Sequence, residues 1–184
     1  MFYPVNCTEL KLLSHQLAKK IKQTENNFNV IVAIARGGLS VANLLSYILD
    51  LPVTTISVST YTGMKKQNTP HIEYGAAKEV EGCNVLLVDD VADSGETLSF
   101  CQNYLKKHKV ASLSLATLFY KPSSTVKPDF FVKQTKDWVV FPYEFPEMTN
   151  IYHEMKSTDT TKAEQLKQAL LKLKLPQQIT EGKL

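Results

Sequence analysis

Residues 85–98 read Val-Leu-Leu-Val-Asp-Asp-Val-Ala-Asp-Ser-Gly-Glu-Thr-Leu, and this stretch decides the fold. Its first four residues are apolar without a break, which is typical of a strand buried on both faces of a parallel sheet. Ser94 and Gly95 then indicate a turn before a helix that we expect near residues 97–107. Because open α/β sheets bind ligands at the carboxyl ends of their strands, Asp89 and Asp90 mark the expected ligand site.

The turn at Ser94 and Gly95, which follows the aspartates, suits a phosphate group, and we name it the phosphate turn. The start of the helix offers the backbone N–H groups and hydroxyls of Ser94 to Thr97, together with the positive end of the helix dipole. Asp89 and Asp90 cannot both stay ionised cheaply when half-buried, whereas Mg²⁺ binds one or two carboxylates and completes its shell with substrate oxygens. The stretch therefore predicts a site for a phosphate and Mg²⁺. The alternative is an acidic strand end that is merely solvated.

The rest of the chain repeats the alternation of strand and helix. Residues 30–35 form an unbroken β-branched and apolar run, the glycine turn 36–38 follows, and residues 39–49 have helical periodicity. Asn6 and Glu9 resemble a capping box, which predicts a first amphipathic helix ending near residue 23. Further strands are expected at residues 53–60, 110–120, 130–132 and 138–141. This order predicts an α/β fold with a mainly parallel sheet flanked by helices on both faces.

Two segments fall outside this alternation. Residues 62–70 are polar with breakers at both ends, and a loop of this length in a compact domain is often a lid. Residues 162–175 place leucines at helical spacing among lysines, which predicts a helix that packs on its own domain or a sister subunit. A helix lying on a membrane surface is the alternative. We therefore expect a main domain at residues 1–150 and a helical extension at residues 151–184.

Size, charge and cysteine content restrict the class of protein. The chain has 184 residues, which is the size of one domain, and a net charge of +3, which is too small to indicate nucleic acid or an acidic membrane as the main partner. Its three cysteines form no C-x-x-C pair, and no apolar run approaches the roughly 18–20 residues of a membrane span. The start of the chain lacks a secretory signal, so a reducing cytoplasm is the expected location.

Motifs of several other enzyme classes are missing. The sequence has no G-x-x-x-x-G-K-[ST], no G-x-G-x-x-G and no G-x-S-x-G, so P-loop, dinucleotide-binding and hydrolase interpretations lack their characteristic turns. His71-Ile72-Glu73 matches half of the zinc deaminase motif, but no P-C-x-x-C follows. Cys101 lies on the helix after the phosphate turn and is expected to be core packing rather than a nucleophile.

Several motifs together resemble those of one enzyme family. Residues 85–98 resemble the phosphoribosyl-pyrophosphate (PRPP) signature of the type I phosphoribosyltransferases, in which four apolar and two acidic residues precede Asp-Ser/Thr-Gly-x-Thr. Residues 35–39 resemble the pyrophosphate loop, and residues 59–61, with Thr60 and Tyr61, resemble the start of the flexible loop. Residues 119–122 and 138–144 look like the base-binding segments of the xanthine-guanine and hypoxanthine members. The resemblance covers about residues 28–145 and implies a small hood beside the sheet.

The resemblance implies how PRPP is bound. Asp89 and Asp90 would face the ribose hydroxyls and Mg²⁺, and residues 94–97 would cradle the 5′-phosphate. The backbone of Arg36 and Gly37 would bind pyrophosphate, next to a cis peptide expected at Ala35–Arg36. Glu144 stands where the family has an aspartate that contacts a second Mg²⁺, and its longer side chain departs from that pattern. The residues implied for PRPP and phosphate are Arg36, Gly37, Asp89, Asp90, Asp93, Ser94, Gly95, Glu96 and Thr97, and those implied for metal are Asp90, Asp89 and Glu144.

The resemblance also implies how a purine is read. Asp93 would act as the catalytic base near purine N7, or as the acceptor that orients the base, and Lys121 would donate to an exocyclic oxygen at position 6. Trp138 would stack on the ring, with a backbone group near Val139 at its edge. A 6-amino group would set donor against donor, so adenine should be rejected. Taken singly, Lys121 is more simply an exposed lysine at a strand end, and Trp138 a core residue.

The activity implied is purine salvage: transfer of phosphoribosyl from PRPP to hypoxanthine, guanine or xanthine, which gives the nucleoside 5′-monophosphate and pyrophosphate. Two alternatives stay open, namely a regulator that binds PRPP or a nucleotide without turnover, and a transferase for another base. Neither nucleic acid nor a membrane is expected as a partner. The resemblance implies a homo-oligomer.

Overall fold

The computed structural model describes residues 1–62, 65–76 and 80–183, which form two compact units. We name Leu13–Lys136 the sheet unit, and Met1–Leu12 together with Asp137–Leu184 the helical unit. The boundary expected at residue 150 falls inside helix α4 (Phe145–Thr158) of the helical unit. All three cysteines lie in the described ranges, and none of them forms a disulfide.

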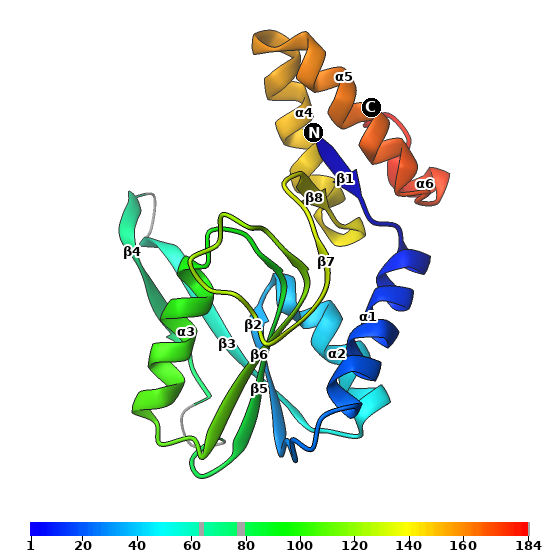
Figure 1. Cartoon of the computed structure of the whole chain (residues 1–184). Coiled ribbons are helices and arrows are strands. Elements are labelled where there is room, and N and C mark those ends of the chain that lie inside the picture. Colours follow the sequence, from blue (N-terminus) through cyan, green and yellow to red (C-terminus); the bar gives the residue numbers. More distant parts are fainter. Residues whose placement is uncertain (63–64, 77–79, 184) are drawn as a thin grey trace. The chain divides into compact units, whose positions relative to one another are not determined.

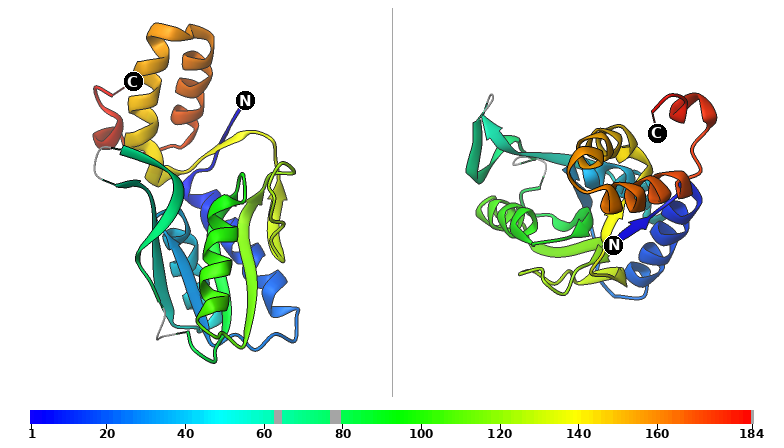
Figure 2. Two further views of the ribbon diagram at one scale, coloured as in Figure 1. Left: turned by 90° about the vertical axis from the view of Figure 1, so that its left-hand side faces the viewer. Right: turned by 90° about the horizontal axis from the view of Figure 1, so that it is seen from above.

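The sheet unit alternates strands and helices. Its elements are α1 (Cys7–Lys22), which begins in the helical unit, β2 (Val30–Ala35), α2 (Gly37–Leu49), β3 (Val53–Thr62), β4 (Lys65–Tyr74), β5 (Asn84–Ala92), α3 (Glu96–Lys107), β6 (Ser112–Tyr120) and β7 (Phe130–Gln134). The strands form one sheet in the order β4-β3-β2-β5-β6-β7, in which β3 and β4 are antiparallel and the other pairs parallel. Helix α2 and the second half of α1 cover one face, and α3 covers the other (Figures 1 and 2). The predicted α/β fold is confirmed.

The central strands are buried on both faces because successive side chains point to opposite sides of a sheet. Val30 and Val32 of β2 share a hydrophobic core with Cys101 of α3, and Ile31 between them is also fully buried. Burial of an aliphatic side chain of this size contributes about 1.5–3 kcal/mol. Only the ends of these strands reach solvent, so polar side chains that could contact a ligand lie at the strand ends.

The register of the sheet brings three strand ends to one edge. Ala33 of β2 pairs with Val88 of β5, so β2 ends level with Asp90. Ala92 of β5 pairs with Tyr120 of β6, so the residues that follow these two strands emerge side by side. The two acidic residues, the turn before α3 and the start of α2 are therefore neighbours.

The helical unit contains a small parallel sheet and a helix pair. Its elements are β1 (Phe2–Pro4), β8 (Trp138–Val140), the 3-10 helix η1 (Pro142–Glu144), α4 (Phe145–Thr158), α5 (Thr160–Lys172) and α6 (Gln177–Thr180). β1 and β8 pair in parallel, with Tyr3 opposite Val139. Phe145 and Tyr152 of α4 share a core with Leu166 and Leu170 of α5.

The helix expected at residues 162–175 is confirmed as α5, and its apolar face packs within its own unit. This outcome agrees with the packing interpretation, because Leu166, Leu170 and Leu173 are buried in the core shared with α4, while Leu171 is 53% exposed. Within the described residues, no helix has the length and apolar character needed to cross a bilayer.

The predicted loop at residues 62–70 is wrong for its second part. Residues 65–70 belong to β4, which pairs with β3 through Thr62 opposite Lys65 and Tyr61 opposite Lys66. Residues 63–64 lie outside the described residues. An edge strand is held by backbone hydrogen bonds to one neighbour, so it can form from a polar sequence without apolar alternation.

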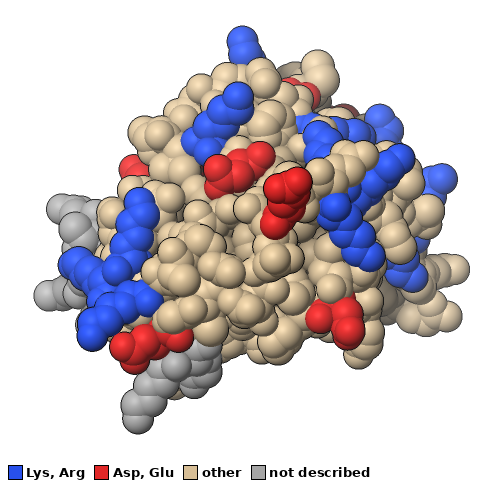
Figure 3. Space-filling view, turned by 60° about the horizontal axis from the view of Figure 1, so that its bottom comes forward, with Lys and Arg blue, Asp and Glu red and all other residues tan. Residues whose placement is uncertain are grey.

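Basic side chains mark the ends of two helices. Lys19, Lys20 and Lys22 lie in the last turn of α1, and Lys106 and Lys107 in the last turn of α3, where cations stabilise the negative end of the helix dipole. Figure 3 shows basic side chains in several separate groups, including some at the top of the view, with acidic and uncharged surface between them. The positive charge on this face is therefore dispersed rather than continuous.

Candidate active site

Two carboxylates lie at the carboxyl end of β5. Asp90 is only 7% exposed, and its backbone N–H donates to Asp89 Oδ1 over 3.0 Å. Burial and the neighbouring charge of Asp90 raise the pKa of Asp89 well above its ordinary range, although hydrogen bonds from the backbone N–H groups of Asp90 and Gly38 oppose the shift. A bound cation would relieve this excess of negative charge.

The acid pair fits Mg²⁺ that arrives with a phosphorylated ligand. Within residues 1–62, 65–76 and 80–183, no cluster of three or more His, Cys, Asp and Glu side chains could hold a metal on its own. Mg²⁺ needs only one or two carboxylates, because waters and phosphate oxygens fill its other positions. Asp89 and Asp90 would supply such a partial set.

Two glycines allow α2 to approach the acid pair. A Cβ on Gly37 would stand 2.5 Å from Asp90 Oδ2, and a Cβ on Gly38 would collide with the carbonyl oxygen of Val88. The cis peptide expected at Ala35–Arg36 is present directly before this helix. The backbone at the start of α2 therefore lies beside the two carboxylates.

The turn from β5 to α3 forms a small hollow of about 70 Å³. Gly95 lies immediately before α3 with a φ of 85°, a conformation that glycine adopts without steric cost. Ser94 Oγ accepts a hydrogen bond from the backbone N–H of Glu96 over 3.3 Å, and Thr97 lies one residue further into the helix. The residues that line the hollow are Asp89, Val91, Asp93, Ser94, Gly95, Thr97 and Leu98. A hollow at a helix N-terminus, lined by hydroxyls and backbone N–H groups, suits a phosphate.

Lys121 and Asp93 form an ion pair beside this hollow. Lys121 Nζ lies 2.8 Å from Asp93 Oδ2, and the backbone N–H of Lys121 donates to the carbonyl of Ala92. The Lys121 side chain is 14% exposed and that of Asp93 63%. Lys121 is therefore not the exposed strand-end lysine of the simpler interpretation. A donor and an acceptor stand side by side at the edge of the phosphate turn.

The segment 121–126 contributes contacts that sequence reasoning missed. Thr125 donates to the carbonyl of Ser94 from its backbone N–H over 2.9 Å and from Oγ1 over 3.0 Å. The cluster of Pro, Ser and Thr in this segment predicts a loop and gives no signal of what the loop contacts.

Three further candidates belong to the helical unit. Trp138 lies on β8 and is 50% exposed, with its ring tilted against Phe2, so it is not a core residue. Val139, beside it, is buried. Glu144 Oε2 accepts a hydrogen bond from the backbone N–H of Phe141 over 2.8 Å. The candidates Arg36, Gly37, Asp89, Asp90, Asp93, Ser94, Gly95, Glu96, Thr97 and Lys121 lie together in the sheet unit.

The remaining residues singled out in the sequence lie on β3 and α3. Thr60 and Tyr61, expected in the flexible loop, lie on β3 at the hairpin. Cys101 is fully buried, and burial and the charge of Asp89 raise the pKa of its thiol to about 12. The expected packing role of Cys101 is confirmed.

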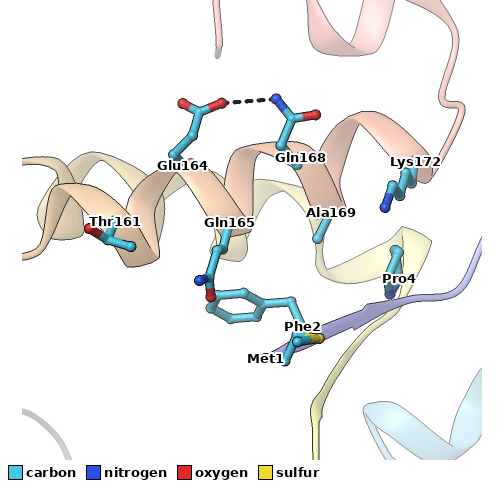
Figure 4. A pocket seen from close by; sticks show the side chains of 9 residues that line it. All are labelled: Met1, Phe2, Pro4, Thr161, Glu164, Gln165, Gln168, Ala169 and Lys172. Carbon is cyan, nitrogen blue, oxygen red and sulfur yellow. Dashed lines mark hydrogen bonds between the residues drawn. The ribbon is translucent and has the colours of Figure 1, made fainter.

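The helical unit also contains a larger cavity of about 460 Å³ between β1 and α5 (Figure 4). Met1, Phe2 and Pro4 line one side of it, and α5 lines the other, where Glu164 and Gln168 are hydrogen-bonded to each other over 2.8 Å. None of the candidate site residues lines this cavity.

Comparisons with known proteins point to one enzyme family. Residues 7–148 match the family model described as the phosphoribosyl transferase domain. The chain is 31% identical over 145 residues to a xanthine-guanine phosphoribosyltransferase of Desulfotalea psychrophila, covering 77% of this chain and 86% of the relative. A solved purine phosphoribosyltransferase from Pyrococcus horikoshii superposes with a TM-score of 0.69 and 34% identity, over 77% of this chain and 93% of that one. The Helicobacter pylori xanthine-guanine-hypoxanthine phosphoribosyltransferase, at 24% identity and a TM-score of 0.65 over 82% of this chain and 97% of that one, shares the fold.

Proposed function

Because this chain belongs to the phosphoribosyl transferase domain family, we propose that it transfers the phosphoribosyl group of PRPP to a 6-oxopurine in purine salvage. The observation that carries the choice of base is the Lys121–Asp93 pair, 2.8 Å apart, beside the phosphate hollow. In its N7–H tautomer, a 6-oxopurine presents an acceptor oxygen and an N7–H donor at neighbouring positions of one edge, which match an ammonium donor and a carboxylate acceptor. Relatives named xanthine-guanine phosphoribosyltransferase support the same class of substrate.

The proposed reaction is a displacement at the anomeric carbon. Purine N9 forms the new bond to C1′ of the ribose while the bond from C1′ to the pyrophosphate oxygen breaks, and Asp93 accepts the proton from N7. Lys121 orients the base through its 6-oxygen. Positioning and charge stabilisation supply most of the acceleration in a reaction of this kind, because the protein forms no covalent bond to the substrate.

The phosphates would be held by backbone and hydroxyl groups at two helix starts. Residues 94–97 would bind the 5′-phosphate, and the backbone of Arg36 and Gly37 would bind pyrophosphate. When bound, Mg²⁺ would neutralise negative charge on pyrophosphate, and Asp89 and Asp90 are the residues that would hold it. Glu144 remains the candidate for a second ion.

Trp138 and Val139 remain the candidates for stacking on the purine and bonding its edge. Thr60 and Tyr61 remain candidates for the flexible loop. A homo-oligomer and a cytoplasmic location are also part of the proposal and rest on the sequence resemblance.

The test is nucleotide formation, measured together with pyrophosphate release. PRPP is incubated with hypoxanthine, guanine, xanthine, adenine or no base, each with Mg²⁺ and with EDTA in its place. We expect turnover with at least one 6-oxopurine, none with adenine and none in EDTA. Binding of PRPP without turnover of any base would instead indicate a non-catalytic regulator. Turnover in EDTA would refute only the proposed role of Mg²⁺ and would leave the proposed transfer reaction standing.

A further inference from the structure

The segment 121–126 is hydrogen-bonded at its start to the end of β5 and near its end to the turn before α3. At its start, the backbone N–H of Lys121 donates to the carbonyl of Ala92 over 2.9 Å. At its end, Thr125 gives two hydrogen bonds to one acceptor, the carbonyl oxygen of Ser94. An internal bond, from the backbone N–H of Ser124 to the carbonyl of Lys121 over 2.9 Å, closes the segment into a turn. The segment is therefore a short brace between β6 and the start of α3.

The brace also packs directly against Gly95. A Cβ on this glycine would lie 2.6 Å from Ser124 Oγ, 2.8 Å from Thr125 Oγ1 and 2.8 Å from the backbone nitrogen of Val126. The Ser124 hydroxyl donates in turn to the carbonyl of Val126 over 2.8 Å, which holds the brace in its own shape. The turn before α3 is thus packed against the brace at Gly95.

Holding the Ser94 carbonyl fixes the direction of the next N–H. The peptide unit between Ser94 and Gly95 is planar and trans, so its C=O and N–H point to opposite sides. With the carbonyl drawn toward Thr125, the Gly95 N–H is directed away from the brace, and Gly95 is one of the residues that line the phosphate hollow.

We propose that Thr125 is a positioning residue, which holds the Ser94–Gly95 peptide in the orientation that donates to the 5′-phosphate of PRPP. The proposal rests on the proposed function, because it names the phosphate group that the turn binds. The same brace begins with Lys121, so one short segment sets the geometry of the base-reading lysine and of the phosphate turn. Thr125 would contact neither substrate.

The test compares two substitutions at one position with a control nearby. Thr125→Val keeps the shape of the side chain and removes the hydroxyl, while Thr125→Ser keeps the hydroxyl. Ser123→Ala removes a hydroxyl from an exposed side chain of the same segment and serves as the matched control. Binding of ribose 5-phosphate by calorimetry needs no turnover, and steady-state KM values for PRPP and for the purine are measured beside it.

We expect Thr125→Val to weaken ribose 5-phosphate binding by about 2- to 10-fold, which is the range of one hydrogen bond, and to raise the KM for PRPP similarly. Thr125→Ser and Ser123→Ala should stay within about two-fold of the unmodified chain, and the KM for the purine should change less than that for PRPP. Equal binding by Thr125→Val, failure of serine to restore binding, or an equal rise in both KM values would overturn the proposal.

The two proposals fail in different ways. If the unmodified chain binds ribose 5-phosphate but turns over no purine, the proposed function fails and Thr125 is still judged by binding. If the unmodified chain turns over purines and Thr125→Val binds ribose 5-phosphate normally, only the role of Thr125 fails. Thermal unfolding of each variant shows whether a loss of binding reflects a loss of folding.

Discussion

Replacement of Lys121 by methionine separates the contribution of the Lys121–Asp93 pair to folding from its contribution to substrate recognition. Methionine keeps an unbranched apolar side chain in the place of the lysine stem, which is largely buried, and removes the ammonium group. Asp93 is 63% exposed, so water and salt screen the pair. Such a pair contributes about 0.2–1 kcal/mol to the free energy of unfolding, and the loss in Lys121→Met should not exceed this.

The expected loss in recognition is larger. A hydrogen bond from a charged donor to a ligand contributes about 1.5–3 kcal/mol, which at about 1.4 kcal/mol for each factor of ten corresponds to about 10- to 150-fold in kcat/KM for hypoxanthine or guanine. The KM for PRPP should change little, because Lys121 faces the purine in the proposed reaction. The activity loss should thus exceed what the stability loss can explain.

The measurements are urea unfolding and steady-state kinetics on Lys121→Met and on Lys107→Met. Lys107 is exposed in the last turn of α3, so its substitution should leave both measurements nearly unchanged. The reasoning fails if Lys121→Met loses PRPP and purine recognition equally. It also fails if the free energy of unfolding falls by more than about 2 kcal/mol, because the pair would then be structural.

Three more substitutions test the acid groups and the glycine beside them. Asp93→Asn keeps the side-chain shape without the basic oxygen, so kcat should fall while the KM for PRPP is spared; unchanged turnover in steady-state assays would remove its role as a base. The raised pKa of Asp89 means that the folded chain binds this proton more tightly than the unfolded chain, so stability without ligand should fall as the pH rises through that pKa. Asp89→Asn should abolish this fall and raise the melting temperature at neutral pH, while it weakens PRPP binding. Thermal unfolding across pH that matches that of the unmodified chain would contradict this expectation. Gly37→Ala places a methyl group 2.5 Å from Asp90 Oδ2, so PRPP binding measured by calorimetry should weaken more than for Ser123→Ala.

The sheet and its site could be predicted from the sequence where local pattern and tertiary packing agree. The apolar run at residues 30–35 became β2 with the same bounds, because a strand buried on both faces must be apolar throughout. The stretch 85–98 contained both the strand and the turn, so Asp89 and the residues after it were brought to one edge by chain connectivity alone.

The remaining features depend on contacts that leave little trace in a single sequence. β4 is an edge strand with polar residues, so its sequence lacks the apolar alternation that would predict a strand paired with β3. Helix α4 has helical spacing at Phe145, Met148 and Tyr152 and a proline in its first turn, so the sequence does contain a signal for this helix. The contact from Thr125 to Ser94 spans 31 residues and joins two loops, for which no periodicity exists.

The thiol of Cys101 offers a way to time the opening of the layer beneath the phosphate turn. A thiol whose pKa is raised to about 12 has almost no thiolate at neutral pH, and its complete burial keeps alkylating reagents away. Cys7 is exposed, so the two sites should be modified at very different rates. The rate of Cys101 labelling would then report the rate of local opening of α3 away from the sheet. A ligand that binds at the start of α3 should lower this labelling rate.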